Sequence, residues 1–176
     1  MTIKKYLNLV REANKLQTEM GKILVFAAHF DGRTYEDFLT SKIDSEDTQK
    51  AMNKASDFIS RMHAIKPLKV EEIEIGGVPY YVDFEPASMT VAQWMDIEAI
   101  STEPDWTNRV LPAIAVCLTK EKGAEYTSSR AEQAKIIEDM PAELAMGLAA
   151  FFLTRSQGLE QSLMASISRV EAELAH

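Results

Sequence analysis

The sequence predicts a mostly α (α+β) fold, a multi-helix domain with one two-stranded antiparallel β-hairpin at about residues 68–84. Residue types that favour helix, above all Ala, Leu, Met, Glu and Lys, are plentiful. Glycine and proline are scarce, at 7 and 6 of 176 residues, which disfavours an all-β sandwich. Apolar and polar residues alternate clearly in one part of the chain, which therefore carries the predicted hairpin.

The composition changes near Lys66, which predicts a helical segment at 1–66 and a hairpin plus helical domain at 67–176, packed as one compact unit. Apolar residues recur at every third or fourth position over residues 2–28. This spacing is typical of one face of a helix and predicts a single long first helix.

Two shorter helices are predicted to follow. Thr34 is placed to cap the first, with Tyr35, Phe38 and Leu39 buried. The second should end near Ile65, because the residue before a proline avoids helical geometry. Its apolar stripe consists of Met52, Ala55, Ile59 and Met62.

The hairpin is predicted from apolar and polar residues that alternate on both sides of Gly76-Gly77. These two glycines supply the positive φ angles of a two-residue turn. The alternation slips at Glu71-Glu72, and a β-bulge would absorb the slip. Pro79 has no amide hydrogen, so its position should face an open edge. The side chains expected to face the core are Leu68, Val70, Ile73, Ile75, Val78, Tyr80, Val82 and Phe84.

Thr90 and Gln93 have the spacing of a capping box, which predicts a helix from Thr90 to about Ile100. The next helix should begin around Pro104 and be kinked or restarted at Pro112. A second capping box at Ser129 predicts a short helix ending near Asp139. Two further segments complete the prediction: a central buried helix that starts at Pro141, and an amphipathic stretch with Leu159, Leu163, Ile167, Val170 and Leu174.

Charge and motif content argue against several functions. The chain has 19 basic and 27 acidic residues, a net charge of -8, and no clustered basic run, which argues against nucleic-acid binding. The longest strongly apolar run, residues 144–153, is too short to span a bilayer. A single cysteine, Cys117, lies among aliphatic residues and suits a core position in a reducing compartment.

No catalytic, cofactor-binding or metal-binding residue is predicted, and we do not expect an enzyme. The three histidines, His29, His63 and His176, lack the ligand spacing of a zinc site. Gly76-Gly77 precedes a strand instead of a helix, so it is not a phosphate-binding loop.

Five segments in order carry a resemblance to a known family: Ile73–Val82, Met89–Glu98, Leu111–Val116, Glu125-Tyr126 with Arg130, and Met140-Pro141 with Gly147–Phe152. Together they span about residues 70–153, and their order resembles that of small tailed-bacteriophage proteins, tail assembly chaperones and other virion-assembly proteins. The resemblance implies a protein that binds phage structural proteins, such as tape-measure, tail-tube or other virion subunits. It also implies a location in the cytoplasm of an infected bacterium or in the virion.

The leading hypothesis is therefore a phage assembly protein that acts by protein–protein binding. We expect it to bind neither nucleic acid nor a membrane, and homo-oligomerisation is possible. The alternatives are a structural virion component of a tailed phage, and an enzyme accessory or regulatory helical domain. A pocket joining Cys117 to His29 or His63 would favour the enzymatic alternative. The candidate partner-binding residues are Met89, Trp94, Met95, Leu159 and Leu163.

Overall fold

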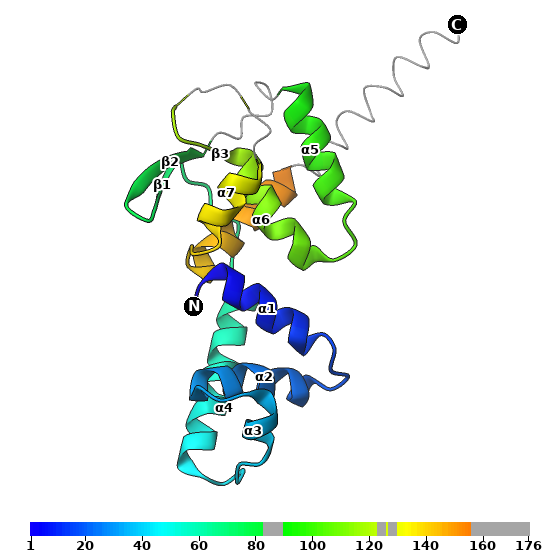
Figure 1. The fold of residues 1–176 in the computed structure, drawn as a ribbon, viewed down its shortest axis with the longest axis vertical. Coiled ribbons are helices and arrows are strands. Elements are labelled where there is room, and N and C mark those ends of the chain that lie inside the picture. The colour runs from blue at the N-terminus through cyan, green and yellow to red at the C-terminus, as the bar shows by residue number, and fades with distance from the viewer. Residues whose placement is uncertain (83–89, 123–125, 127–129, 156–176) are drawn as a thin grey trace, which may run out of the picture. The chain divides into compact units, whose positions relative to one another are not determined.

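The predicted fold class is confirmed: the described residues form eight helices and a small three-stranded antiparallel sheet that includes the hairpin (Figure 1). The chain divides into two compact units, an N-terminal unit of residues 1–65 and a C-terminal unit of residues 66–176. The computed structural model describes residues 1–82, 90–122, 126 and 130–155.

Each helix of the N-terminal unit begins at a hydroxyl residue that caps it. The side chains of Thr2, Thr18, Thr34 and Ser45 each accept a hydrogen bond from the backbone amide three residues further along. These bonds satisfy amides that have no partner inside the helix. The four helices are α1 (Ile3–Ala13), α2 (Glu19–Asp31), α3 (Tyr35–Leu39) and α4 (Glu46–His63).

The prediction of one helix over residues 2–28 was wrong. The chain leaves the helical path after α1, where the amide of Asn14 still donates to the carbonyl of Val10 at 2.8 Å. The second helix starts anew at Thr18, whose hydroxyl oxygen accepts the Gly21 amide at 3.0 Å. Apolar spacing continues across this break, so periodicity alone did not reveal it.

Aromatic side chains from three helices form the core of the N-terminal unit. The ring of Phe58 on α4 lies 6.0 Å from Tyr6 on α1, and 6.2 and 5.6 Å from Phe26 and Phe30 on α2. These edge-on and tilted contacts add to the burial of apolar area that stabilises the unit. The buried stripe of α4 consists of Ala51, Ala55, Phe58 and Met62, whereas Met52 and Ile59 are half-buried.

The Thr34 cap is confirmed, but only part of the burial predicted for α3 is. Phe38 is buried, Tyr35 is half-buried and Leu39 is 54% exposed. This helix of five residues turns one side toward the rest of the N-terminal unit. Phe38 lies on that side, and Leu39 lies next to it and remains exposed.

The sheet of the C-terminal unit has three strands in the order β1 (Glu72–Ile75), β2 (Val78–Val82) and β3 (Leu118–Thr119). Gly76 and Gly77, with φ of 60° and 79°, form the predicted two-residue turn. The predicted two-stranded hairpin is confirmed, and the sheet has one strand that was not predicted, because β3 pairs with the far side of β2. That pairing joins residues distant in sequence, which local alternation cannot reveal.

The first strand is also shorter than predicted. The amide of Leu68 donates to the carbonyl of Gly147 at 2.9 Å instead of entering the ladder, so pairing begins near Glu71. Ile73, Ile75 and Tyr80 are buried as predicted, but Val78, beside the turn, is 44% exposed. Phe84 lies outside the described residues.

Helices make up most of the C-terminal unit: α5 (Val91–Ser101), α6 (Trp106–Cys117), α7 (Arg130–Ile137) and a helix over 142–155. Asp105 caps α6, so Pro104 precedes that helix and does not form its first turn. Helix α6 continues through Pro112 without a restart. Of the described helices, none is both long and apolar enough to cross a membrane.

The core of the C-terminal unit lies around α6, which packs against α5 and α7. Ile114 and Leu148 are completely buried, and Cys117 is buried with them. The helix over 142–155 buries one side and exposes Glu143 and Arg155, so the prediction of a central buried helix is only partly confirmed. The core position predicted for Cys117 is confirmed.

Candidate functional site: the outer face of α5

Helix α5 is held in the C-terminal unit by its start and by its inner side. The hydroxyl of Thr90 accepts the Gln93 amide at 3.1 Å, which confirms the predicted cap. The Gln93 side-chain amide donates to the carbonyl of Val116 on α6, at 3.2 Å. Ile97 and Ile100 are buried, so one side of α5 packs against the unit.

The opposite side of α5 presents apolar side chains to solvent. Val91 is 77% exposed and Met95 is 62% exposed. Residues three and four apart lie on one side of a helix, so Val91, Met95 and Glu98 form a single row. Trp94 is half-buried at the margin of that row. We call Val91, Trp94, Met95 and Glu98 the α5 face.

A side-chain hydrogen bond connects α5 to the segment that follows β3. The hydroxyl of Tyr126 donates to the carboxylate of Asp96. Burial, followed by the proximity of Cys117, raises the pKa of Tyr126 above its ordinary value, so the hydroxyl remains a donor at neutral pH. Asp96 is therefore engaged within the unit, whereas Glu98 is exposed beside Met95.

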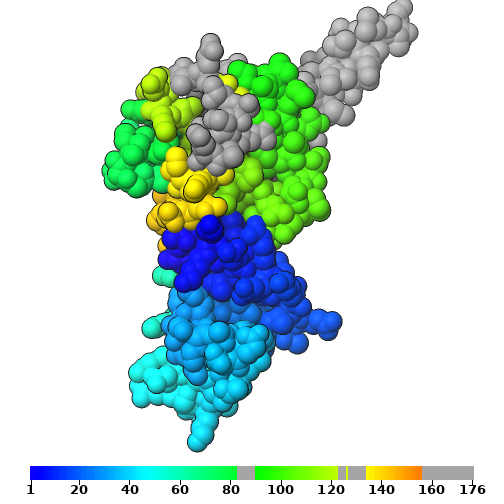
Figure 2. Space-filling model, in the orientation of Figure 1, coloured from blue at the N-terminus to red at the C-terminus, as the bar shows by residue number. Residues whose placement is uncertain are grey.

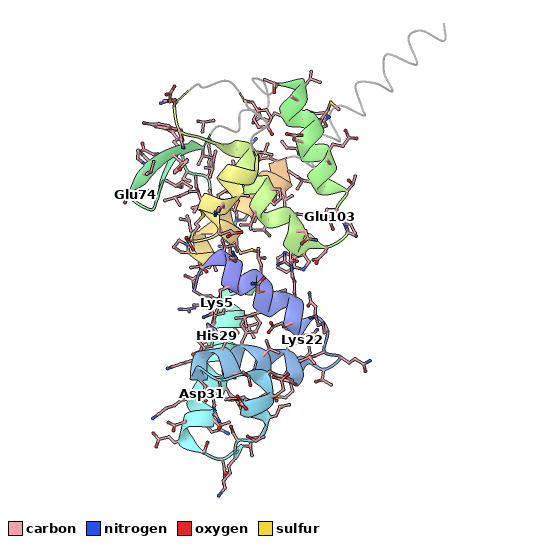
Figure 3. The ribbon with its side chains drawn as sticks, in the orientation of Figure 1. Lys5, Lys22, His29, Asp31, Glu74 and Glu103 are labelled. Carbon is pink, nitrogen blue, oxygen red and sulfur yellow. The ribbon has the colours of Figure 1, made fainter. Side chains whose placement is uncertain are left out.

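The C-terminal unit, which contains the α5 face, is strongly acidic. The N-terminal unit has ten basic and nine acidic residues, a net charge of +1, and the C-terminal unit has nine basic and eighteen acidic residues, a net charge of -9. Residues 70–108 contain nine acidic residues and no Lys, Arg or His. Glu74 on β1 and Glu103 after α5 belong to this stretch (Figure 3).

The structure places two of the five predicted partner-binding residues, and both lie on the α5 face. They are Trp94 and Met95, while Met89, Leu159 and Leu163 lie outside the described residues. The sequence prediction missed Val91, the most exposed large apolar residue of the described chain. Its spacing of four from Met95 was the available signal. The space-filling view shows part of this helix at the surface (Figure 2).

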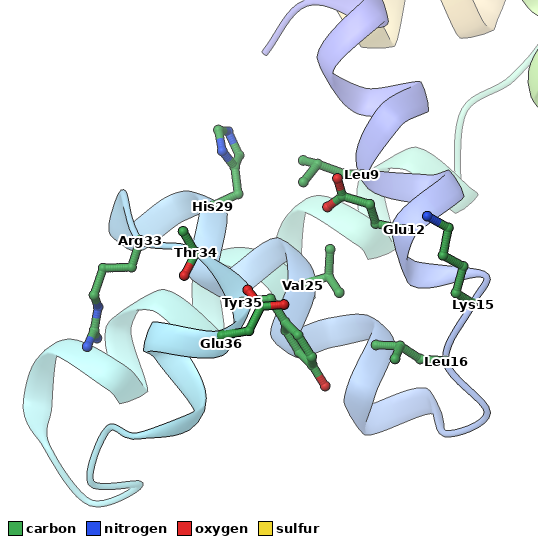
Figure 4. Close-up of a pocket in the computed structure, with 10 residues that line it drawn as sticks. All are labelled: Leu9, Glu12, Lys15, Leu16, Val25, His29, Arg33, Thr34, Tyr35 and Glu36. Atoms are coloured by element: carbon green, nitrogen blue, oxygen red, sulfur yellow. The ribbon is translucent and has the colours of Figure 1, made fainter.

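A second candidate is a cleft of about 640 Å³ in the N-terminal unit, between α1, α2 and α3 (Figure 4). This volume lies within the range of ligand pockets. Its floor is apolar, with Leu9 and Val25 buried and Leu16 half-buried. Its rim carries the charged side chains of Glu12, Lys15, Arg33 and Glu36.

The polar groups of this cleft do not converge on one point. His29 and Arg33 point in different directions (Figure 4). The Arg33 guanidinium bonds the carboxylate of Asp31, donates to Ser41 Oγ at 2.6 Å and lies over the ring of Phe38. These contacts hold the α2–α3 connection together, so Arg33 has a structural role beside the cleft.

The pKa of His29, at the rim of the cleft, lies below its ordinary value, which favours the neutral imidazole. Burial is the largest cause of its lowered pKa, and the positive charges of Lys5 and the N-terminal amine add to it. A neutral imidazole at the cleft rim can accept a proton or a hydrogen bond. The cleft therefore combines an apolar floor, charges of both signs and one neutral base.

The residues of the enzymatic alternative belong to different units. Cys117 is buried in the C-terminal unit, whereas His29 and His63 lie in the N-terminal unit. A nucleophilic cysteine needs partial exposure in an electropositive setting. In the part of the chain that the structure describes, no three His, Cys, Asp or Glu side chains are grouped to hold a metal ion.

No family model, no curated protein and no solved structure matches this chain.

Proposed function

We propose that this chain is an assembly protein of a tailed bacteriophage, similar to a tail assembly chaperone, and that it acts by binding phage structural proteins. The observation that carries the binding role is the α5 face. Val91 and Met95 are exposed on a helix whose other side is firmly packed, so their exposure does not follow from a loosely attached helix. Clustered exposed apolar side chains are typical of protein-binding surfaces.

The phage assignment rests on the resemblance over residues 70–153, a stretch that includes α5. Tape-measure, tail-tube and other virion subunits are the partners that this resemblance implies. A protein that holds such a subunit before assembly needs an accessible apolar surface and a charge that keeps it in solution. The α5 face and the net charge of -9 in its unit meet these requirements.

Binding can be tested with purified tape-measure and tail-tube proteins of the phage that encodes this chain. The double variant Val91→Ser/Met95→Ser should weaken binding about tenfold or more, as expected for apolar contacts at the centre of an interface. Ile43→Ser is the matched control, because Ile43 is 70% exposed but belongs to the N-terminal unit. Equal binding by wild type and the double variant would contradict a role for the α5 face.

A structural virion component is the alternative that remains within the same class. Mass spectrometry of purified phage particles separates the two roles, because a chaperone leaves before the particle is complete. A gene position outside any phage tail or head cluster, combined with no binding to these subunits, would refute the phage assignment itself.

A further inference from the structure

We propose that the α5 face binds a basic amphipathic segment of another protein, with two apolar side chains on Val91 and Met95 and a Lys or Arg beside Glu98. This inference rests on the proposed function, because it specifies the partner of the same surface. The apolar pair spans one helical turn, and Glu98 follows on the same side one turn further. An amphipathic helix that lies along α5 can match this row with its own i and i+4 positions.

Charge complementarity selects the sign of the partner. Glu98 is exposed, and among the described residues its carboxylate has no ion-pair partner. Residues 70–108 contain no basic side chain, and the Arg109 guanidinium, which follows them, donates to the carbonyl of Glu103 beyond the end of α5. A partner with Lys or Arg beside its apolar residues therefore gains attraction, and one with Asp or Glu is repelled.

The same charges disfavour the two occupants that this chain could itself provide. Two copies joined through α5 would bring their acidic residues together, which opposes a symmetric dimer at this surface. Residues 156–176 contain the apolar stripe beginning at Leu159, but they carry three glutamates and one arginine. Both occupants are thus acidic, whereas the face calls for a basic one.

The probe is a pair of synthetic amphipathic peptides of about 18 residues, or about five helical turns, with identical leucine positions. One has lysine at every polar position and the other has glutamate. Each carries a fluorescent label, and its anisotropy is followed as the full-length protein is added. We expect the lysine peptide to bind, with an affinity that falls as salt is raised, and the glutamate peptide to bind at least about tenfold more weakly.

Variants locate the binding and separate its two components. Val91→Ser/Met95→Ser should weaken lysine-peptide binding about tenfold, and Glu98→Gln should weaken it less while reducing its salt dependence. Ile43→Ser should bind as wild type does. Circular dichroism of each variant establishes that it is folded.

Several outcomes would overturn the inference. Equal binding of the lysine and glutamate peptides would remove the role of charge, and unchanged binding by the Val91→Ser/Met95→Ser variant would place the site elsewhere. Sedimentation that shows a dimer lost in the Met95→Glu variant would make a second copy the occupant. If phage subunits bind through α5 but the lysine peptide does not, the inference fails and the proposed function stands.

Discussion

Replacing Ile97 and Met95 separately by alanine compares the two sides of α5 within one helix. Ile97 is 8% exposed and Met95 is 62% exposed. Truncating a buried isoleucine to alanine removes apolar contacts and leaves a cavity, at a cost of about 2–5 kcal/mol. We therefore expect Ile97→Ala to lower the free energy of unfolding by about 3 kcal/mol, and Met95→Ala to change it by less than about 0.5 kcal/mol.

Urea unfolding followed by tryptophan fluorescence is the appropriate assay. Trp94 and Trp106 are the only tryptophans and both lie in the C-terminal unit, so the signal reports on the unit that contains α5. In a thermal experiment, a loss of about 3 kcal/mol corresponds to about 6–12 °C for a protein of this length. Alanine favours helix at both positions, so helix propensity does not account for the difference between the variants.

Two results would refute the reasoning. A loss of stability for Met95→Ala equal to that for Ile97→Ala would mean that the outer side of α5 is covered within the folded chain. That result would remove the basis for a free binding surface. A negligible effect of Ile97→Ala would mean instead that the inner side of α5 contributes little packing, contrary to its burial.

Three further predictions concern the N-terminal unit and are measured by circular dichroism. Thr18→Ala, which removes the acceptor for the Gly21 amide, should lower the free energy of unfolding by about 1 kcal/mol. Thr18→Ser keeps a hydroxyl acceptor and should lower it much less. Gly32→Ala should cost about 1 kcal/mol, because φ at Gly32 is 76°; Gly32→Asn should cost less, and equal costs would contradict this reason. The unfolded chain protonates His29 before the folded chain does, so stability should be full above about pH 6.5 and fall below it. His29→Gln should reduce that pH dependence, and an unchanged slope would exclude His29 as its source.

Local signals in the sequence located most helix starts and the hairpin turn. Thr34 and Thr90 cap helices as predicted, and Gly76-Gly77 makes the turn. A cap or a tight turn involves atoms within about four residues, so its chemistry can be recognised in a short stretch of sequence. Thr18 carries the same kind of signal for the start of α2, but the apolar periodicity continues across the break before it.

Pairing between distant residues was beyond prediction from local patterns. Strand β3 joins β2 across more than thirty positions, and the Gln93 side chain donates to the carbonyl of Val116, 23 positions away. Contacts between distant residues also decide which side of α5 remains exposed. Helix α5 is apolar on several sides, with Val91, Met95, Ile97 and Ile100 all in one helix.

By itself, the sequence determined that α5 is a helix, where it begins, and that its surroundings are acidic. Only the tertiary structure decided that Ile97 and Ile100 face inward while Val91 and Met95 remain exposed. A helix with apolar residues around its circumference can pack with more than one side, and periodicity does not distinguish among them. The choice is made by the partners that the rest of the chain brings to it, here α6 and the carbonyl of Val116.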